Sequence, residues 1–534
     1  MDALSGFSAR KTPQSEQASP RQKENNAGGY SFETTDLAKL HRFLTLGTEG
    51  GTFYVRERAL TKANAEFLMT LAKAGDLRLI TETADISLAG RAPRNNPALF
   101  ALAVASGLTE DTSAAYRSAA LAALPAVART GSHLLTWASY IENFRGWGPQ
   151  LTKAVGDWYN RKSLEDVAYQ VLKYQQRGGW SQRDLLRLAH FGRKVIEPER
   201  MRLYRAVMNL PYDGSLPHPF AAVDAAHSTS DVHKWVSLIE QNYSLSWEML
   251  PSQALAEARV WTALVENGNL PLGALLRNLG RITSLGVVSH LGGSITAEVA
   301  QKLADPAGLA RARIHPMAIL VAMKTYAQGH GVKGKLTWDP SAKVSDALDA
   351  GFYASFPSVK PCGLPMVVAV DVSGSMGWGA ISGLPLTPRE AACALALVTM
   401  ASEPDATIMA FSRELVPVDI SPRMRLDNVI RKMASIPMGG TDCSLPMQVM
   451  EREKIPVNLF QVITDCETWA GPIHAHQALE QYRREMGIAA RLAVVGMTAT
   501  DITIADPLDP GSLDVAGFDA SVPKMLADFG RGEL

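Results

Sequence analysis

The stretch Leu364–Met376, LPMVVAVDVSGSM, constrains the fold more than any other part of this 534-residue chain. It begins with the apolar run Met366–Val370, which is short and does not alternate with polar residues. Such a run is typical of a strand that is buried on both faces of a parallel sheet. The stretch therefore predicts an α/β domain in which a polar turn directly follows one of the strands.

That turn carries one carboxylate and two hydroxyls within five residues, at Asp371, Ser373 and Ser375. In open α/β sheets, ligands bind at the carboxyl ends of the strands. These side chains offer only hard oxygen ligands, which suit Mg²⁺ or another small divalent cation better than zinc. Gly374 allows a turn tight enough for both hydroxyls to face one point. The alternative is a polar strand-end turn that binds nothing.

Two later stretches have the same character. Gly439–Asp442, GGTD, is a glycine turn that presents a threonine hydroxyl, and Val457–Asp465 is a second apolar strand that ends in a carboxylate. Together with the first turn, they resemble the metal-ion-dependent adhesion site of von Willebrand factor A domains, written D-x-S-x-S. The resemblance implies hydroxyl ligands at Ser373, Ser375 and Thr441. It also implies that two carboxylates act through water and hydrogen bonds, those of Asp371 and Asp465.

Length and charge distribution indicate more than one domain, since 534 residues are too many for a single core. Residues 356–534 contain 14 Lys and Arg against 21 Asp and Glu, a net charge of −7, which leaves +7 on residues 1–355. The acidic part does not favour polyanions, whereas the basic part could bind them.

The pattern of apolar residues in the sequence changes at about residue 357. Residues 27–357 show apolar positions at helical spacing, interrupted by short breaks with Gly, Pro or Asn, which predicts an all-α region. We expect an α-solenoid of the HEAT type, with an irregular helical domain as the alternative. In residues 358–534, strand-like and helical runs alternate, which predicts an α/β, doubly wound, Rossmann-type domain. Residues 1–26, rich in polar residues, are predicted to be a disordered tail.

Cysteine usage and hydropathy predict a cytoplasmic protein. The four cysteines form no C-x-x-C pair and no cluster with histidine, which argues against a disulfide scaffold and a structural zinc site. Residues 1–26 lack the apolar core of a signal peptide, and no run of ~18 apolar residues predicts a membrane span. We expect a monomer in a reducing compartment.

Basic and aromatic residues cluster between residues 146 and 190. Arginine and lysine can neutralise phosphates, and aromatic faces can stack on unpaired bases, so the cluster is a candidate RNA-binding surface. The alternative is structural: Trp158 and Tyr174 would belong to a core, and the charges would be a solvated face.

With both parts interpreted, the chain resembles the Ro ribonucleoprotein (Ro autoantigen) family, with its TROVE module, from about Asn26 to the C-terminus. The most specific stretches are LHRFLTLGTEGGTFY (40–54), KYQQRGGWSQRDLLRLAH (173–190), LLRNLGRIT (275–283), RIHPMAIL (313–320), YAQGHGVKGKLTW (326–338), DVSGSM (371–376), PMGGTDCSLPM (437–447) and TDCETWAG (464–471). Residues 191–253 match less well.

The resemblance implies a ring of HEAT-like repeats closed by a von Willebrand factor A-like domain. It implies that small Y-type RNA binds on the outer surface, and that single-stranded 3′ ends of misfolded non-coding RNA bind in a central hole. Bacterial relatives associate with a 3′ exoribonuclease through a Y RNA. The RNA-contacting residues of the family map to Lys173, Arg177 and His190.

Lys173 and Arg177 are four residues apart, so on a helix they would share one face. We expect Gly178 and Gly179 to end that helix, and a second helix over 182–189 to bring His190 beside the patch. One departure lies at Cys466, where the family usually has Asn after the metal-site aspartate. Asn offers a hard oxygen and two donors, which Cys lacks.

The pattern favours a non-catalytic RNA-binding protein. A nuclease or other hydrolase would need a nucleophile–base pair or carboxylates that hold two metals, and the sequence shows no such constellation. His315 and His330 could act as bases in principle, but neither has a partner visible in the sequence. A third interpretation is a protein–protein adhesion module in which a partner carboxylate completes the metal site.

Overall fold

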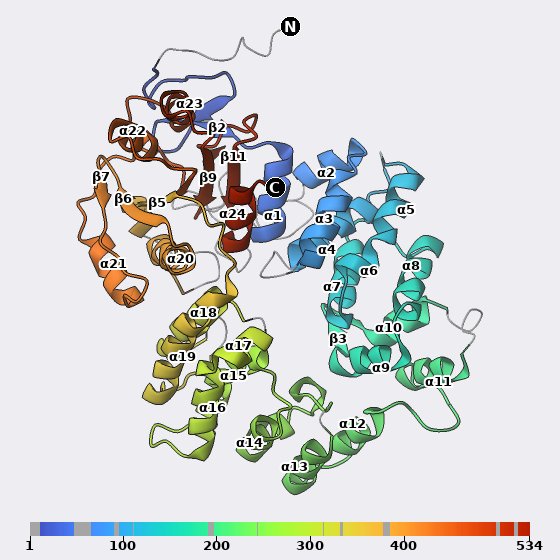
Figure 1. Ribbon diagram of the computed structural model, residues 1–534. Coiled ribbons are helices and arrows are strands. Elements are labelled where there is room, and N and C mark those ends of the chain that lie inside the picture. The colour runs from blue at the N-terminus through green and yellow to red at the C-terminus, as the bar shows by residue number, and fades with distance from the viewer. Residues whose placement is uncertain are drawn as a thin grey trace. The chain divides into compact units, whose positions relative to one another are not determined.

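The computed structural model describes residues 11–46, 66–89, 95–110, 112–190, 197–242, 244–312, 314–331, 335–377, 385–497, 502–516 and 522–533. The chain divides into two compact units. The helical unit comprises Leu60–Ile314 and Ala322–Ala354, and the α/β unit comprises Met1–Ala59, His315–Val321 and Ser355–Leu534. Figure 1 labels most of the elements of both.

Helices follow one another through the helical unit. They are α2 (Glu66–Lys73), α3 (Arg78–Ala89), α4 (Asn96–Gly107), α5 (Ala114–Ala122), α6 (Leu124–Val127), α7 (Gly131–Ile141), α8 (Pro149–Asn160), α9 (Leu164–Lys173), α10 (Gln182–Leu188), α11 (Pro198–Val207), α12 (Phe220–His227), α13 (Val232–Gln241), α14 (Ala258–Glu266), α15 (Leu272–Ser284), α16 (Ser294–Ala304), α17 (Pro306–Arg311) and α19 (Ala342–Ala354). Helix α18 (Pro316–Ala327) spans a boundary between the units. A two-stranded hairpin interrupts the series, with β3 (Gln176–Arg177) and β4 (Trp180–Ser181).

Neighbouring helices pack in pairs, as the apolar spacing predicts. Helix α4 contacts α3, α5 and α7, and its residues from Pro97 to Gly107 are all buried. A helix that is apolar all round belongs in a core, and small side chains allow close approach of its neighbours. Farther along, α16 packs on α19. The predicted all-α region is therefore confirmed.

The α/β unit alternates strands and helices after residue 358. Its elements are β5 (Met366–Asp371), α20 (Pro388–Ser402), β6 (Ala406–Phe411), β7 (Leu415–Pro417), α21 (Leu426–Ala434), α22 (Leu445–Arg452), β8 (Leu459–Thr464), α23 (Ala475–Met486), β9 (Arg491–Gly496), β10 (Ile502–Thr503), β11 (Ser512–Ala516) and α24 (Val522–Arg531). In the described part of the chain, the main sheet has six strands in the order β11-β9-β8-β5-β6-β7. All neighbouring pairs are parallel except β6 with β7.

This topology confirms the predicted doubly wound α/β fold. Strands β5 and β8 are buried along their whole length, which explains their apolar runs. Alternate strand residues, among them Val367 and Phe460, share a core with α22 and α23, and α20 packs on β5 and β6. The chain moves from β5 to β6 on one side and later to β8 on the other. The carboxyl ends of β5 and β8 therefore form a topological switch point, where ligands bind in folds of this kind.

The N-terminal residues differ from the prediction of a disordered tail over residues 1–26. Strand β1 (Gln22–Glu24) pairs with β2 (Tyr30–Glu33), and β2 pairs with β10, so residues 22–33 form part of a sheet in the α/β unit. Helix α1 (Asp36–Leu46) also belongs to this unit. The structural boundary therefore departs from the predicted helical-repeat domain over 27–357. Residues 1–10 lie outside the described residues.

Candidate metal centre and nucleic-acid interface

The predicted metal-site residues lie at the carboxyl ends of β5 and β8. Asp371 is the last residue of β5 and is fully buried. Ser373 and Ser375 follow it, Ser375 in the short 3₁₀ turn Gly374–Gly377, and Asp465 comes directly after β8. Because parallel strands end at one edge of the sheet, residues 94 positions apart converge there.

Hydrogen bonds fix the first turn. The Ser373 N–H donates to Asp371 Oδ1 at 2.8 Å, and the Ser373 and Ser375 hydroxyl oxygens are 3.1 Å apart. Thr464, at the end of β8, donates its hydroxyl to Asp371 Oδ2 at 2.6 Å. The carboxylate is thus held by both strands, and the two serine hydroxyls lie side by side.

Ionising both buried carboxylates, Asp371 and Asp465, is unfavourable in the protein without a bound cation. Burial, and then the negative charge of Asp465, raise the pKa of Asp371, and burial raises the pKa of Asp465. Within the described residues, neither carboxylate forms an ion pair with Lys or Arg. A cluster of oxygen ligands whose negative charge is not balanced by Lys or Arg is suited to a hard divalent cation. The described residues contain no group of three or more His, Cys, Asp or Glu that could hold a metal, so hydroxyl oxygens would have to complete the set.

Thr441 is buried on the glycine turn between α21 and α22. Its carbonyl accepts the N–H groups of Trp469 at 3.0 Å and Ala470 at 3.1 Å, so this turn is joined to the loop that follows Asp465. Cys466 lies in that loop with a φ of 66°, a left-handed conformation in which Asn is enriched among non-glycine residues. Its N–H donates to Thr464 Oγ1 at 3.1 Å.

Lys173 is mostly buried among polar and aromatic side chains. Its Nζ donates to the Tyr169 hydroxyl at 2.9 Å and lies 3.8 Å from Glu248 Oε1. It also lies over the rings of Tyr169 and Tyr174, and 17% of its side chain is exposed. Burial lowers the pKa of Lys173, but the hydrogen bond with Tyr169 and the charge of Glu248 outweigh it and raise the pKa overall. Lys173, which the family resemblance maps to the RNA-contacting residues, is therefore mostly buried rather than exposed.

Arg177 does not share a helix face with Lys173, so that expectation is wrong. Helix α9 ends at Lys173, and Arg177 lies on β3 of the hairpin, paired with Trp180. Gly178 and Gly179 have φ values of 58° and 84° and form the hairpin turn. Two positive φ values match the primed turns that join two-residue hairpins, which is why glycines stand there. Arg177 is exposed.

The second helix is confirmed. Ser181 caps α10, its hydroxyl accepting the N–H of Asp184 at 3.2 Å while the Asp184 carboxylate accepts the Ser181 N–H. His190 lies two residues beyond the helix, exposed, with a φ of 51°. We call Arg177, Arg183, Arg187 and His190 the cationic segment. Within the described residues, none of the four forms an ion pair with a carboxylate.

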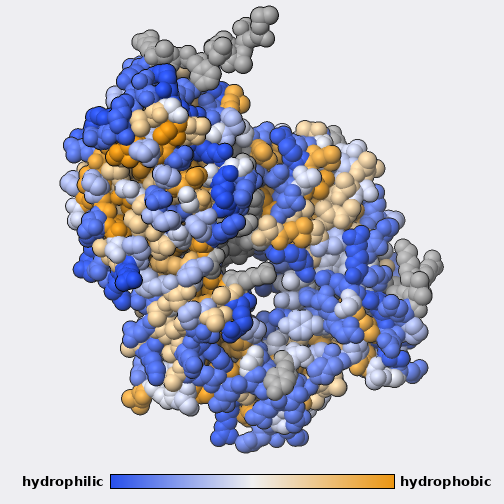
Figure 2. Space-filling view, in the orientation of Figure 1, coloured by the Kyte–Doolittle hydropathy of each residue, from blue (hydrophilic) through white to orange (hydrophobic). Residues whose placement is uncertain are grey.

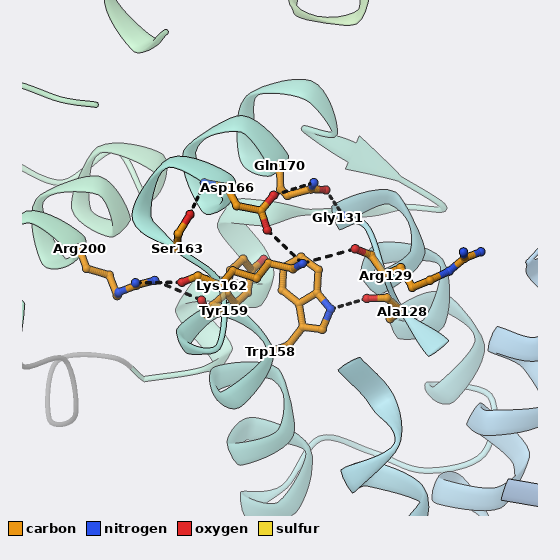
Figure 3. Close-up of polar contacts among 10 residues, drawn as sticks. All are labelled: Ala128, Arg129, Gly131, Trp158, Tyr159, Lys162, Ser163, Asp166, Gln170 and Arg200. Atoms are coloured by element: carbon orange, nitrogen blue, oxygen red, sulfur yellow. Dashed lines mark hydrogen bonds and ion pairs between the residues drawn. The ribbon is translucent and has the colours of Figure 1, made fainter. Parts of the chain in front are cut away.

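Other members of the basic and aromatic cluster have structural roles, as Figure 3 shows for the junction of α8 and α9. Trp158 is buried and donates its indole N–H to the Ala128 carbonyl at 2.5 Å. Lys162 lies over the Trp158 ring, 4.9 Å from its centroid, and 3.2 Å from Asp166. Arg200 donates to the carbonyl of Lys162 at 2.9 Å. The structural alternative thus holds for this half of the cluster.

The surface around the β3–β4 hairpin is polar and carries aromatic side chains. Trp180 packs on Trp147, with ring centroids 5.1 Å apart, and donates its indole N–H to Glu142 at 3.1 Å. On the face shown in Figure 2, hydrophilic residues predominate over α9 to α11. Aromatic rings beside exposed arginines are the combination that RNA-binding surfaces use.

Gln14 lies beside the candidate metal centre, although no sequence motif identifies it as a site residue. Gln14 and Thr468 are buried, and their side chains are hydrogen-bonded to each other beside Asp442, which is also buried. Gln14 lies in a polar stretch typical of a tail, so neither composition nor periodicity could identify it.

The fold and the strand-end turns define a class of protein, in which a helical-repeat region is joined to a von Willebrand factor A-type domain with a D-x-S-x-S turn. The model of the Ro60 vWA domain matches residues 365–530, and that of the TROVE domain matches residues 23–214 and 239–325. The chain therefore belongs to the Ro60 family.

Relatives match along nearly the whole chain. The RNA-binding protein RO60 of Deinococcus radiodurans is 39% identical over 529 residues, which are 98% of each chain. That of Caenorhabditis elegans is 31% identical over 598 residues, covering 98% of this chain and 92% of the relative. The crystal structure of the D. radiodurans RO (RSR) protein matches with a TM-score of 0.75 at 38% identity, covering 94% of this chain and 100% of that one.

Proposed function

We propose that this chain is a non-catalytic RNA-binding protein. It binds small Y-type RNA on the outer surface of its helical unit and single-stranded 3′ ends of misfolded non-coding RNA in a central hole. Relatives named as RNA-binding proteins over the full length of the chain support this function. The observation in the structure that carries it is the cationic segment beside the Trp147–Trp180 pair, in which Arg177, Arg187 and His190 are exposed and form no ion pair with the residues that the structure describes.

The binding chemistry follows from the cationic segment. Arg177 and Arg187 are exposed and 10 residues apart, on the hairpin and on α10. Guanidinium groups pair with phosphates through two parallel hydrogen bonds. Neutralising a phosphate releases counterions from the RNA, which makes the affinity depend on salt concentration. His190 adds a group that can donate to phosphate or stack on a base. Lys173 would act differently, by holding the end of α9 from inside.

We also propose that one Mg²⁺-class ion binds at the ends of β5 and β8. Hydroxyls of Ser373, Ser375 and Thr441 would hold it directly, and Asp371 and Asp465 through water. The cation would offset the charge of the buried carboxylates and offer an open position to an oxygen ligand. A metal-dependent adhesion module without RNA readout is the alternative function, favoured by the exposed Met438 and Trp469 near the Thr441 turn.

RNA processing would be done by a 3′ exoribonuclease that joins the complex, the chain itself being a monomer in the cytoplasm. The two relatives described above are named as RNA-binding proteins. Among the described helices, none combines the length and apolar character needed to cross a membrane.

Filter binding at several salt concentrations tests the RNA function. We expect Arg177→Ala/Arg187→Ala to weaken binding of structured RNA and to lower the slope of log affinity against log salt by about one for each lost phosphate contact. The matched control is Arg452→Ala/Arg484→Ala on α22 and α23, because both side chains are exposed arginines next to a glutamate. If the folded Arg177→Ala/Arg187→Ala variant bound RNA with the same affinity and the same salt slope as the wild type, the proposal would be contradicted.

A further inference from the structure

The N-terminal residues Thr12–Phe32, which we call the strap, lie against the loops that carry the candidate metal ligands. Gln14 donates its backbone N–H to the Gly471 carbonyl at 2.9 Å, and the Tyr30 N–H donates to the Gln14 carbonyl at 2.8 Å. The Gln14 side chain is fully buried. A tail that only covered the surface would not need to bury an amide among polar partners, since burial is favourable only when the amide is fully hydrogen-bonded.

The amide of Gln14 connects two of the site's loops. Its Nε2 donates to Asp442 Oδ1 at 2.7 Å and to the Ile473 carbonyl at 2.8 Å. Its Oε1 accepts the hydroxyl of Thr468. Asp442 directly follows Thr441 in the chain, and the Thr468 hydroxyl lies 3.2 Å from the Thr441 carbonyl. Through these contacts, one side chain of the strap bonds to the residue next to a candidate ligand and to the loop after Asp465.

A second part of the strap holds that loop from the other end. Asn25 Nδ2 donates to the Thr468 carbonyl at 2.7 Å, and Asn26 Nδ2 donates to Glu467 Oε1 at 2.7 Å. The hydroxyl of Ser31 donates to the Cys466 carbonyl at 3.2 Å. The loop residues 466–468 therefore each have a partner in the strap, directly after Asp465.

Backbone packing shows how close this contact is. A Cβ on Gly29 would lie 2.0 Å from the Thr468 carbonyl oxygen, and one on Gly471 would lie 2.3 Å from both Asp442 Oδ1 and Gln14 Nε2. Neither position has room for a side chain, so the strap and the loops fit each other as a core does.

We propose that the strap is part of the metal centre, with Gln14 as a positioning residue for the Thr441 turn and for the loop after Asp465. This inference rests on the proposed Mg²⁺ site. Direct ligands keep their geometry only when the groups behind them are hydrogen-bonded, and loss of such outer partners typically lowers metal affinity 10–100-fold. Without the strap, the hydroxyl of Thr441 and the carboxylate of Asp465 would lose a shared support that fixes them relative to the β5 turn.

Calorimetric titration of the full chain with Mg²⁺ tests the proposal. We expect Gln14→Leu, which keeps the approximate size but removes the amide, to weaken Mg²⁺ binding about 10-fold. Arg21→Ala is the matched control, because Arg21 belongs to the same strap but pairs with the distant Asp506 at 2.6 Å, with 43% of its side chain exposed. This control should bind Mg²⁺ as the wild type does.

A merely structural role predicts a different result. In that case, Gln14→Leu would lower the melting temperature of the metal-free protein and leave the Mg²⁺ affinity of the folded protein unchanged, which would overturn the proposal. Asn26→Ala is the second variant, since Asn26 is exposed and its loss should not unfold the chain. It should weaken Mg²⁺ binding less than Gln14→Leu does, and faster hydrogen exchange over 466–473 should accompany the loss.

The outcomes separate this proposal from the one on which it rests. No Mg²⁺ heat with the wild type would overturn the metal site and the strap's role together. Normal binding by the wild type and equal binding by both strap variants would overturn the strap's role alone. Weaker binding by Gln14→Leu and Asn26→Ala, but not by Arg21→Ala, would support it.

Discussion

The candidate metal centre and the cationic segment hold their side chains in opposite ways. Asp371 is fully buried and accepts hydrogen bonds from two elements, whereas Arg177 and Arg187 are exposed and form no ion pair in the described part of the chain. The buried centre has its geometry fixed before any ligand arrives. The cationic segment leaves its side chains free to adapt, at the cost of ordering them on binding.

This difference separates two kinds of mutational effect. A change in the metal centre alters stability and ligand binding together, because its carboxylates are part of the core. A change in the cationic segment should alter binding alone, because surface substitutions away from packing features usually have small effects on stability. Lys173 is assigned to the RNA-contacting residues by resemblance, but it is partly buried. Its substitution should therefore affect stability, as substitutions in the candidate metal centre do.

The largest effect is expected from Asp371→Asn. The variant keeps the size of the side chain but removes a negative charge from the proposed Mg²⁺ site, so we expect the calorimetric heat of Mg²⁺ binding to disappear. The metal-free protein should remain folded, because the variant also removes the repulsion between Asp371 and Asp465. Mg²⁺ affinity equal to that of the wild type would show that Asp371 does not support a metal.

A smaller effect is expected from pH. The folded pKa of Asp371 is raised, so between its unfolded and folded pKa values the folded protein holds more protons than the unfolded one. The free energy of unfolding of the metal-free protein should therefore fall as the pH rises from about 4 through the folded pKa. Saturating Mg²⁺ should reverse this trend, because the cation binds the ionised site.

Thermal melts of the wild type and Asp371→Asn, with and without Mg²⁺, check the pH effect. Their difference isolates Asp371 from other shifted groups, such as His476, whose pKa burial lowers to about 4. For a unit of 150–250 residues, each kcal/mol moves the melting temperature by about 2–4 °C. A difference that does not change with pH would mean that Asp371 titrates at its ordinary value.

The position of the candidate metal centre in the fold was predictable because short motifs determine it. The predicted strand Met366–Val370 ends within one residue of β5, and the carboxyl ends of two buried strands necessarily meet at one sheet edge. The strap was not predictable, since Gln14 becomes buried only through partners more than 420 residues away. Polar residues in a Ser- and Gln-rich stretch are usually solvated, and nothing local distinguishes this one.

The candidate RNA-binding segment shows the limit of local periodicity. A spacing of four residues predicted a shared helix face for Lys173 and Arg177, but the Gly178-Gly179 pair forms a hairpin turn instead of a helix end. Both outcomes use a glycine with positive φ, so the residue type alone cannot choose between them. Helix α10 was predictable, because Ser181 and Asp184 form a capping box before an apolar pair.

The smallest expected effect is that of Lys173→Ala, and it sharpens the comparison most directly. The variant removes a hydrogen bond to Tyr169 and a cation from two aromatic rings, and it leaves Glu248 without its partner at 3.8 Å. We expect a loss of about 1 kcal/mol in the free energy of unfolding. The salt slope of RNA binding should change less than in Arg177→Ala, because a lysine already bonded within the protein releases few counterions. Chemical denaturation and filter binding of both single variants decide this. If Lys173→Ala lowered the salt slope of RNA binding by a full unit and left the denaturation midpoint unchanged, Lys173 would contact RNA directly rather than stabilise the end of α9.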